Sequence, residues 1–512
     1  MGRYFAMTAI PYVNGTPHIG HALELLQCDV LGRHRRSRGE EVRTQTGTDD
    51  NALKNMQSAE AEGISPQEYV ARVAERFAAL QGPLDLWFDD FIRTSSDPRH
   101  RPGVEKLWRA CADNGDFYRK SYTGRYCYGC EQFYTEAELV DGLCPEHLVR
   151  PELVEENNWF FRLSRYQEQL TELISSDRLQ VEPASRKREV LSFVESGLED
   201  FSVSRSMHRA RGWGIPVPDD PEQVIYVWYD ALANYITAPG YGTDPETFAY
   251  WWSEPDELVH VIGKGIIRFH AVYWPAMLIS AGLRLPTTIF VHEYLTADGA
   301  KISKSAGNAK DPAELAESFG TDALRWWMLR DVALAGDTDY TDQRLVTRNN
   351  EDLANNIGNL VNRTVSMANK YRDGRLAVLT EDGKHEQGVV DADRARLRQA
   401  RAAARGRLDA AMAGFDFRRA AEVITELGNE GNRYVEAAMP WTLAKAERAE
   451  SAPPEALDTV LAELVATCRE LGQLLVPFLP SAAQAIVDQT GAGSQQLPKP
   501  TPIFRRLELD EQ

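Results

Sequence analysis

The chain opens with a strand, a turn and a helix in close succession, and this order limits the possible folds more than any other feature. Residues 4–8 form a short apolar run, residues 14–17 read Asn-Gly-Thr-Pro, and residues 22–27 have the spacing of a helix. Such a turn leaves backbone N–H groups at the positive end of the helix dipole, where a phosphate group is the expected ligand. The pattern therefore predicts the opening of a nucleotide-binding α/β fold.

Two histidines lie at the start of that helix. His18 and His21 are three residues apart, so they share one helix face and both can donate hydrogen bonds to phosphate oxygens. A solvated pair of histidines or half of a metal site would have the same spacing, and the fragment alone leaves these alternatives open.

A loop rich in lysine and serine follows about 280 residues later. Residues 298–308 read Asp-Gly-Ala-Lys-Ile-Ser-Lys-Ser-Ala-Gly-Asn. Such a loop can close over a polyphosphate and bring Lys301 and Lys304 to the charge on a leaving pyrophosphate. Lysine and serine runs are usually solvated loops, so the loop alone carries little weight. Together with Pro-His-Ile-Gly-His at residues 17–21 it resembles the two signature motifs of class I aminoacyl-tRNA synthetases, HIGH and KMSKS.

Three of the six cysteines gather in one short segment with a histidine. Cys127 and Cys130 form a Cys-x2-Cys pair, and thirteen residues later Cys144 and His147 form Cys-x2-His. Three thiolates and an imidazole at this spacing fit a closed, tetrahedral, structural zinc site in a reducing compartment. Unligated cysteines in a β-rich insertion are the alternative.

The overall charge and hydropathy limit the partners and the compartment. The formal net charge is −19, which argues against non-specific binding of the whole chain to DNA or another polyanion. No apolar run reaches the ~18 residues of a membrane span, and no signal-peptide pattern precedes the first strand. We therefore expect a cytoplasmic protein with no membrane partner.

Further candidates follow the predicted strands and helices. Residues 41–51 predict a second strand that ends in Asp49-Asp50-Asn51, where an acidic side chain can bind an ammonium group or a ribose, or where Asp50 or Asn51 caps the next helix. Three side chains of a predicted helix share one face and can belong to the core or to a pocket: Trp228, Leu232 and Tyr235.

The helical part of the chain after about residue 349 holds another group. Asn359 and Arg363 share a helix face, and Trp441 follows Pro440 at a predicted helix start. Trp441 can pack in the core, or it can stack on an unstacked RNA base.

Several further motifs make the chain resemble the methionyl-tRNA synthetase family over nearly its whole length. The motifs that carry the resemblance are residues 10–15, the Cys/His segment, residues 155–164, 213–218, 227–235 and 269–276, and Lys-Ile-Ser-Lys-Ser at 301–305. The insertion has little room beyond the Cys/His segment, whereas a leucine, isoleucine or valine enzyme would carry a much larger editing domain.

The resemblance implies the following roles. His18, His21, Lys301 and Lys304 would be catalytic, and ATP would be bound by His18, Gly20, His21, Glu24, Gly263, Lys301, Ser303 and Lys304. Asp49 would hold the methionine α-ammonium group, and the methionine pocket would be lined by Ile10, Tyr12, Trp228, Ala231, Leu232, Tyr235 and His292. The anticodon would be read by Asn359, Arg363 and Trp441.

The implied activity is that of a methionine–tRNA ligase, which uses ATP with Mg²⁺ to form methionyl adenylate from L-methionine and then charges tRNA(Met). Two alternatives are an amino-acid adenylating paralogue that does not use tRNA and a tRNA-binding protein without catalysis. No appended tRNA-binding module of the kind through which some relatives dimerise follows the helical part, so we expect a monomer.

A chain of 512 residues is expected to hold two to four domains. We expect an α/β, doubly wound parallel-sheet (Rossmann-type) catalytic domain with a zinc-containing insert, followed by an all-α helix bundle. The expected parts are the first half of the catalytic domain at 1–115, the insert at 116–224 with its zinc knuckle at about 126–147, the second half at 225–295, the KMSKS loop and stem-contact region at 296–348, and the anticodon-binding bundle at 349–512.

Three positions depart from the family pattern. Asp50-Asn51-Ala52 stands where Glu-His-Gly usually follows Gly-Thr-Asp, so any role of that histidine is absent. Gly265 stands where an aspartate commonly binds ribose, and Glu293 brings a carboxylate close to the pocket where glycine is frequent.

Overall fold

A computed structural model gives the fold, and it describes residues 2–127, 132–145, 148–297, 299–302, 309–376, 388–491 and 496–509. The chain divides into two compact units, Met1–Tyr294 and Leu295–Gln512. This division falls one residue before the predicted boundary at 295/296. The predicted boundaries at 115/116, 224/225 and 348/349 stay predictions.

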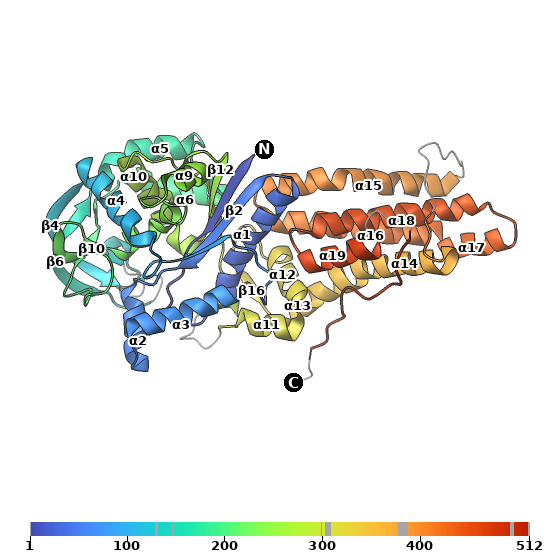
Figure 1. The fold of residues 1–512 in the computed structure, drawn as a ribbon, viewed down its shortest axis with the longest axis horizontal. Helices are drawn as coiled ribbons and strands as arrows, with labels where there is room; N and C mark the ends of the chain where they lie inside the picture. The colour runs from blue at the N-terminus through green and yellow to red at the C-terminus, as the bar shows by residue number, and fades with distance from the viewer. Residues whose placement is uncertain are drawn as a thin grey trace. The chain divides into compact units, whose positions relative to one another are not determined.

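The first unit is built on a six-stranded sheet, of which Figure 1 labels β2 (Glu41–Thr48) and β12 (Glu257–Gly263). Every neighbouring pair in the sheet is parallel, which confirms the predicted α/β class. In spatial order the strands are β3 (Asp90–Arg93), β2 (Glu41–Thr48), β1 (Arg3–Thr8), β12 (Glu257–Gly263), β13 (Thr288–His292) and β7 (Gln180–Glu182).

Helices cover both faces of this sheet. Arg35 of α1 (Ile19–Ser37) stacks on the ring of Tyr4 in β1, with 4.7 Å between guanidinium carbon and ring centroid. The next residue, Phe5, points to the opposite face and shares a buried cluster with Leu107 of α4 (His100–Asp113). The remaining helices of this unit are α2 (Leu53–Glu62), α3 (Pro66–Ala79), α5 (Gln167–Ser175), α6 (Ala184–Glu195), α7 (Val227–Leu232), α8 (Asn234–Thr237), α9 (Pro245–Phe248) and α10 (Trp274–Ser280). Short 3₁₀ or π segments are η1 (Glu136–Glu138), η2 (Leu163–Tyr166), η3 (Ala249–Ser253), η4 (Lys264–Ile266) and η5 (Phe269–Tyr273).

Antiparallel strands occupy much of the segment predicted as an insertion. A long hairpin forms between β4 (Phe117–Cys127) and β6 (Glu152–Phe161), with β5 (Gln132–Tyr134) and β8 (Phe201–Ser202) at its edges. A second small sheet holds β9 (Ser204–Ser206), β10 (Pro216–Val217) and β11 (Asp220–Ile225). The segment is not separate throughout, because β7 within it joins the main sheet beside β13.

The second unit is mainly helical, which confirms the predicted bundle. Buried side chains such as Ile424, Leu427 and Val435 recur at helical spacing along α16 (Phe417–Ala438), so that one face packs against neighbouring helices. Figure 1 shows α15, α16 and α18 running alongside one another. The helices of the second unit are α11 (Pro312–Phe319), α12 (Thr321–Arg330), α13 (Asp342–Arg348), the π segment η6 (Asn349–Gly358), α14 (Asn359–Arg372), α15 (Gly388–Ala413), α16 (Phe417–Ala438), α17 (Pro440–Arg448), α18 (Pro454–Leu475) and α19 (Pro480–Gln489).

A small sheet opens this unit. It consists of β14 (Leu295–Ala297), β15 (Ala300–Lys301) and β16 (Thr338–Tyr340). Within the described part of the chain, no helix has the length and apolar character needed to cross a membrane.

Candidate active site

The two histidines of the opening motif cap helix α1 together. His18 has an extended backbone and is the N-cap residue, and its Nδ1 accepts the N–H of Gly20 at 3.1 Å. The Nδ1 of His21 accepts the N–H of His18 at 3.2 Å, and the two rings stack with centroids 3.8 Å apart. Because both Nδ1 atoms accept, each neutral ring carries its proton on Nε2 and is a donor there. The structure thus brings the two predicted imidazoles together as one element.

Gly20 makes this arrangement possible. A Cβ atom at position 20 would lie 2.9 Å from Cε1 and 3.0 Å from Nδ1 of His18, closer than side-chain atoms pack. The ring of His18 therefore occupies the space that any other residue at this position would need.

Glu24 and His292 meet at the end of strand β13. His292 Nε2 lies 3.0 Å from Oε2 of Glu24, which is one helical turn beyond Gly20 on α1. The register also pairs Gly263 of β12 with His292. Residues predicted for ATP and for methionine thus adjoin at this edge of the sheet.

Aromatic side chains gather around α7 and α8, where the apolar methionine pocket is predicted. Trp228 is half-buried and stacks on Phe269 with ring centroids 3.9 Å apart, and Tyr12 packs edge-on against it at 6.1 Å. Tyr235 is buried, and its hydroxyl lies 2.8 Å from Nε2 of His270. The core alternative for the helical stripe holds for Leu232 and Tyr235, whereas Trp228 packs at the border of the core, and the pocket role of all three stays a prediction. Ile10 is partly buried and Ala231 is buried.

Sequence reasoning assigned no role to Phe269 or His270, although both stand in the 269–276 motif. His270 Nδ1 lies 2.9 Å from the carbonyl oxygen of Ile266, so it donates there and Nε2 accepts the Tyr235 hydroxyl proton. Burial lowers the pKa of His270 to about 4 and keeps the ring neutral.

Asp49 lies beside Tyr12 just after the end of β2. Its backbone N–H donates to the carbonyl of Pro11 at 2.9 Å, and the backbone pairs it with Tyr12. The alternative that Asp50 or Asn51 caps the next helix is wrong, because α2 has Ala52 at its N-cap and no side-chain cap. Asp50 is fully buried instead and accepts from Ser95 Oγ at 2.7 Å, and burial raises its pKa.

Glu293 forms a buried ion-pair cluster next to His292. Its carboxylate is 3% exposed and accepts from Nη2 of Arg186 in α6 at 2.6 Å. Nζ of Lys264, the residue after Gly263, lies 3.3 Å from it. The carboxylate predicted near the pocket is thus neutralised by two cations, whereas Gly265 is exposed and offers no side chain.

Two of the four predicted zinc ligands lie in one buried cluster. Cys127 ends β4 and Cys144 follows the next turn, and both pack with Tyr134, whose hydroxyl lies 3.4 Å from Cys144 Sγ. Cys130 and His147 lie outside the described residues. Among the residues that the structure describes, no group of three or more potential ligands gathers, so the zinc site stays a prediction.

The lysine loop belongs to the second unit. Lys301 ends β15, but the structure does not describe its side chain. Ser303 and Lys304 lie outside the described residues. The start of the loop is held by Asp339 of β16, whose Oδ1 accepts from Thr296 Oγ1 at 2.8 Å and from the N–H of Gly299 at 2.9 Å. The predicted meeting of these lysines with the histidine pair stays a prediction.

The three predicted anticodon residues lie on two helices of the bundle. Asn359 is exposed on α14, and Arg363, one turn later, pairs with Glu436 near the end of α16 at 2.7 Å. Trp441 is the second residue of α17, which starts just beyond the end of α16, and it is 42% exposed. The packing alternative for Trp441 is therefore not favoured.

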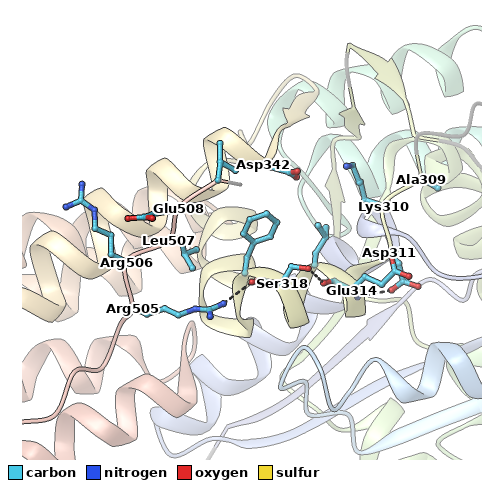
Figure 2. A pocket seen from close by; sticks show the side chains of 13 residues that line it. Ala309, Lys310, Asp311, Glu314, Ser318, Asp342, Arg505, Arg506, Leu507 and Glu508 are labelled. Carbon is cyan, nitrogen blue, oxygen red and sulfur yellow. Dashed lines mark hydrogen bonds between the residues drawn. The ribbon is translucent and has the colours of Figure 1, made fainter. Parts of the chain in front are cut away.

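A pocket of about 540 Å³ lies elsewhere in the second unit, around the start of α11 and the C-terminal segment (Figure 2). Arg505 crosses it and donates from Nη2 to the carbonyl of Ser318 at 2.9 Å. Basic and acidic side chains alternate around it, and none of the predicted site residues lines it. Its mixed charge gives it no preference for a phosphate.

Comparison with known proteins identifies the family of the chain. The family described as tRNA synthetases class I (M) matches residues 4–150 and 147–365, and the anticodon binding domain of methionyl tRNA ligase matches residues 385–508. The chain belongs to the methionyl-tRNA synthetase family.

Relatives within the methionyl-tRNA synthetase family match over nearly the whole length. The methionine–tRNA ligase of Brucella suis is 40% identical over 532 aligned positions that cover 100% of this chain and 99% of the relative. The ligase of Mesorhizobium japonicum is 42% identical over 491 positions, covering 95% of this chain and 91% of the relative. A solved Mycobacterium tuberculosis methionyl-tRNA synthetase in complex with methionyl-adenylate matches with a TM-score of 0.90 and 37% identity, over 99% of this chain and 100% of that one.

Proposed function

We propose that the chain is an ATP-dependent methionine–tRNA ligase, which activates L-methionine as methionyl adenylate and transfers it to the 3′ end of tRNA(Met). The observation that supports this most is that a capped imidazole pair follows β1, while Asp49 and His292 lie at the carboxyl ends of β2 and β13 in the same parallel sheet. The related Mycobacterium tuberculosis structure holds methionyl-adenylate, the intermediate of this reaction.

Methionine binding would use the pocket and the acid beside it. Asp49 is buried next to Tyr12, so its carboxylate is suited to the α-ammonium group. The thioether side chain would lie against aromatic rings, with which polarizable sulfur makes favourable contacts. The residues proposed to line this slot are Ile10, Tyr12, Trp228, Ala231, Leu232, Tyr235 and His292.

Activation would proceed by in-line attack of the methionine carboxylate on the α-phosphate of ATP, with pyrophosphate as leaving group. The Nε2–H groups of His18 and His21 are suited to donate to phosphate oxygens, where negative charge develops. Mg²⁺ bound to ATP would neutralise part of that charge. The further residues proposed to bind ATP are Gly20, Glu24, Gly263, Lys301, Ser303 and Lys304. Positioning and charge stabilisation would then supply the catalysis.

A structural zinc ion would be held by Cys127, Cys130, Cys144 and His147. The burial of Cys127 and Cys144 in one small cluster supports this, because thiolates of a closed site must lie together and away from water. The apolar part of that cluster is small, so a metal would supply stability that packing does not.

The helical unit would read the anticodon through Asn359, Arg363 and Trp441. The exposure of Trp441 supports base stacking, and the exposed Asn359 and half-exposed Arg363 can pair with base edges. We further propose a cytoplasmic monomer that binds no DNA. The net charge of −19 supports this, because self-repulsion opposes association and binding to polyanions.

The test is methionine-dependent exchange of pyrophosphate into ATP, followed by charging of tRNA that bears a CAU anticodon. We expect exchange with methionine and charging of that tRNA alone. Exchange with another amino acid but not with methionine would contradict the assignment. Exchange without charging would favour an adenylating enzyme that does not use tRNA.

A further inference from the structure

A buried carboxylate lies among the pocket residues without being part of the pocket. Asp230 of α7 stands between Trp228 and Ala231 in sequence and is 1% exposed. Its Oδ2 accepts from Nδ2 of Asn51 at 2.7 Å, and its Oδ1 lies 2.6 Å from Nε2 of His100. Both oxygens are thus held by side chains from other elements.

The hydrogen-bond contacts of Asp230 continue through His100 to a third side chain in the core. Nδ1 of His100 lies 2.8 Å from Oγ1 of Thr237, so hydroxyl, imidazole and carboxylate form a chain. His100 and Thr237 are both fully buried, so this chain of side chains lies in the core. The chain anchors Asp230, and with it α7, to α4 and α8.

Asn51 links this anchored carboxylate to Asp49. Its side-chain amide donates to Asp230, and its backbone N–H donates to Oδ1 of Asp49 at 3.1 Å. Asn55 Nδ2 donates to the carbonyl oxygen of Asp49 at 2.9 Å and fixes the backbone there. One residue therefore bridges the acid at the end of β2 and the helix that carries the aromatic pocket.

We propose that Asn51 and Asp230 are positioning residues that fix Asp49 relative to the methionine side-chain pocket. This rests on the proposed function, in which Asp49 binds the ammonium group and α7 lines the pocket. A substrate held at both ends depends on the spacing of the two anchors, and a shift of about 1 Å can cost 100-fold in rate. Asparagine serves here because its amide donates without titrating, whereas the histidine frequent in the family would change charge near neutral pH.

The charged groups around Asn51 decide how a substitution would act. It touches the carboxylates of Asp49 and Asp230, and His100 faces Asp230 from the other side. Asp50 is the next acid, and it is held by Arg93 Nε at 3.2 Å and by Ser95. A carboxylate at position 51 would therefore meet that of Asp230 at close range, while the backbone N–H of the same residue holds Asp49.

The decisive variant is Asn51→Asp, assayed by methionine-dependent pyrophosphate exchange at pH 8.5 and pH 5.5. At pH 8.5 the new carboxylate repels that of Asp230, and we expect the methionine KM to rise about 100-fold. At pH 5.5 the crowded acid is protonated and its O–H can donate to Asp230, so the KM should return to within about threefold of the wild type. The KM for ATP should stay within about threefold at both values, because His18 and His21 lie outside this network.

Asn114→Asp is the matched control. Nδ2 of Asn114 donates to the buried carboxylate of Asp116 at 2.8 Å, so the same change brings a carboxylate against an aspartate. Asn114 follows the far end of α4, away from His100. Its methionine KM should not depend on pH more than that of the wild type.

The double variant Asn51→Asp with Asp230→Asn tests the link directly. The amide and the carboxylate exchange places, so the hydrogen bond between the two positions is kept and His100 keeps an acceptor. We expect its methionine KM at pH 8.5 to lie within about fivefold of the wild type. This variant also serves if Asn51→Asp alone fails to fold at pH 8.5.

The outcomes separate the two proposals. A wild type without methionine-dependent exchange overturns the proposed function. If the wild type is active, any of three results overturns the positioning role. These are a methionine KM of Asn51→Asp that does not depend on pH, a pH dependence of that KM equal to that of Asn114→Asp, or a folded double variant whose methionine KM stays raised 100-fold.

Discussion

Replacement of Gly20 by alanine tests whether the geometry of the histidine cap carries catalysis. The added Cβ would lie 2.9 Å from Cε1 of His18, at least 0.5 Å inside an ordinary contact of about 3.4 Å, so the ring must move. That movement breaks the bond from the Gly20 N–H to His18 Nδ1 and disturbs the stack on His21. The Nε2–H of His18 then leaves the position where it would meet the phosphate.

The expected loss of activity is large and the expected loss of stability is small. One misplaced donor to a developing phosphate charge costs about 100-fold in rate, or about 2.7 kcal/mol of transition-state stabilisation. Loss of the cap costs about 1 kcal/mol, and alanine in place of glycine in the first helical turn offsets up to about that amount. The pyrophosphate exchange rate should fall about 100-fold, while the free energy of unfolding changes by less than about 1 kcal/mol.

Two further variants make the test specific. In His18→Ala the ring is gone, so adding Gly20→Ala should lower exchange no further. Gly406→Ala is the matched glycine control, because it is exposed on α15 and no atom lies within 4 Å of the added Cβ. A Gly20→Ala protein with exchange within twofold of the wild type would refute the reasoning, and additive losses in the double variant would assign the effect to another contact.

Four other perturbations have defined outcomes. Lys304→Ala should lower methionine-dependent exchange by two to three orders of magnitude, and unchanged exchange would refute its role. Trp441→Ala should raise the KM for tRNA about 10-fold through lost stacking and leave exchange unaltered, as compared in parallel assays. Gly406→Ala should raise the free energy of unfolding by about 1 kcal/mol, measured by urea denaturation. Burial lowers the pKa of His270 from 6.5 to about 4, so the unfolded chain binds the proton first as the pH falls. Between pH 6.5 and pH 4 the free energy of unfolding of the wild type should fall by about 3 kcal/mol more than that of His270→Gln. Equal pH profiles of the urea midpoint in the two proteins would contradict this.

The parts of the fold that the sequence predicted correctly depend on local periodicity. The strand, turn and helix at residues 4–27 and the buried strands at 258–264 and 288–292 all have patterns that a short window contains. β7 was missed because three residues hold too little pattern, and its place is determined by pairing with β13. The contact with β13, which is distant in the sequence, therefore determines where β7 forms.

The site shows the same division. The proximity of His18 to His21 followed from their spacing, but their mutual capping through Nδ1 depends on rotamers that the sequence does not specify. Asp50 was considered as a helix cap, yet burial beside Arg93 and Ser95 determined its place. The bond from Asn51 to Asp230 joins residues 179 positions apart, and no local pattern predicts it.

The buried cluster of Glu293, Arg186 and Lys264 restricts how this chain can diverge. Glycine at position 293 alone would leave two cations without their shared acid, and loss of Arg186 alone would remove the nearer of the two cations from a carboxylate that is 3% exposed; breaking a buried ion pair costs about 3–5 kcal/mol. Neither position can drift by itself. Descendants of this enzyme should therefore keep both Glu293 and Arg186 or replace both together. A chimera that transplants only one of the two segments that carry these residues should fold poorly.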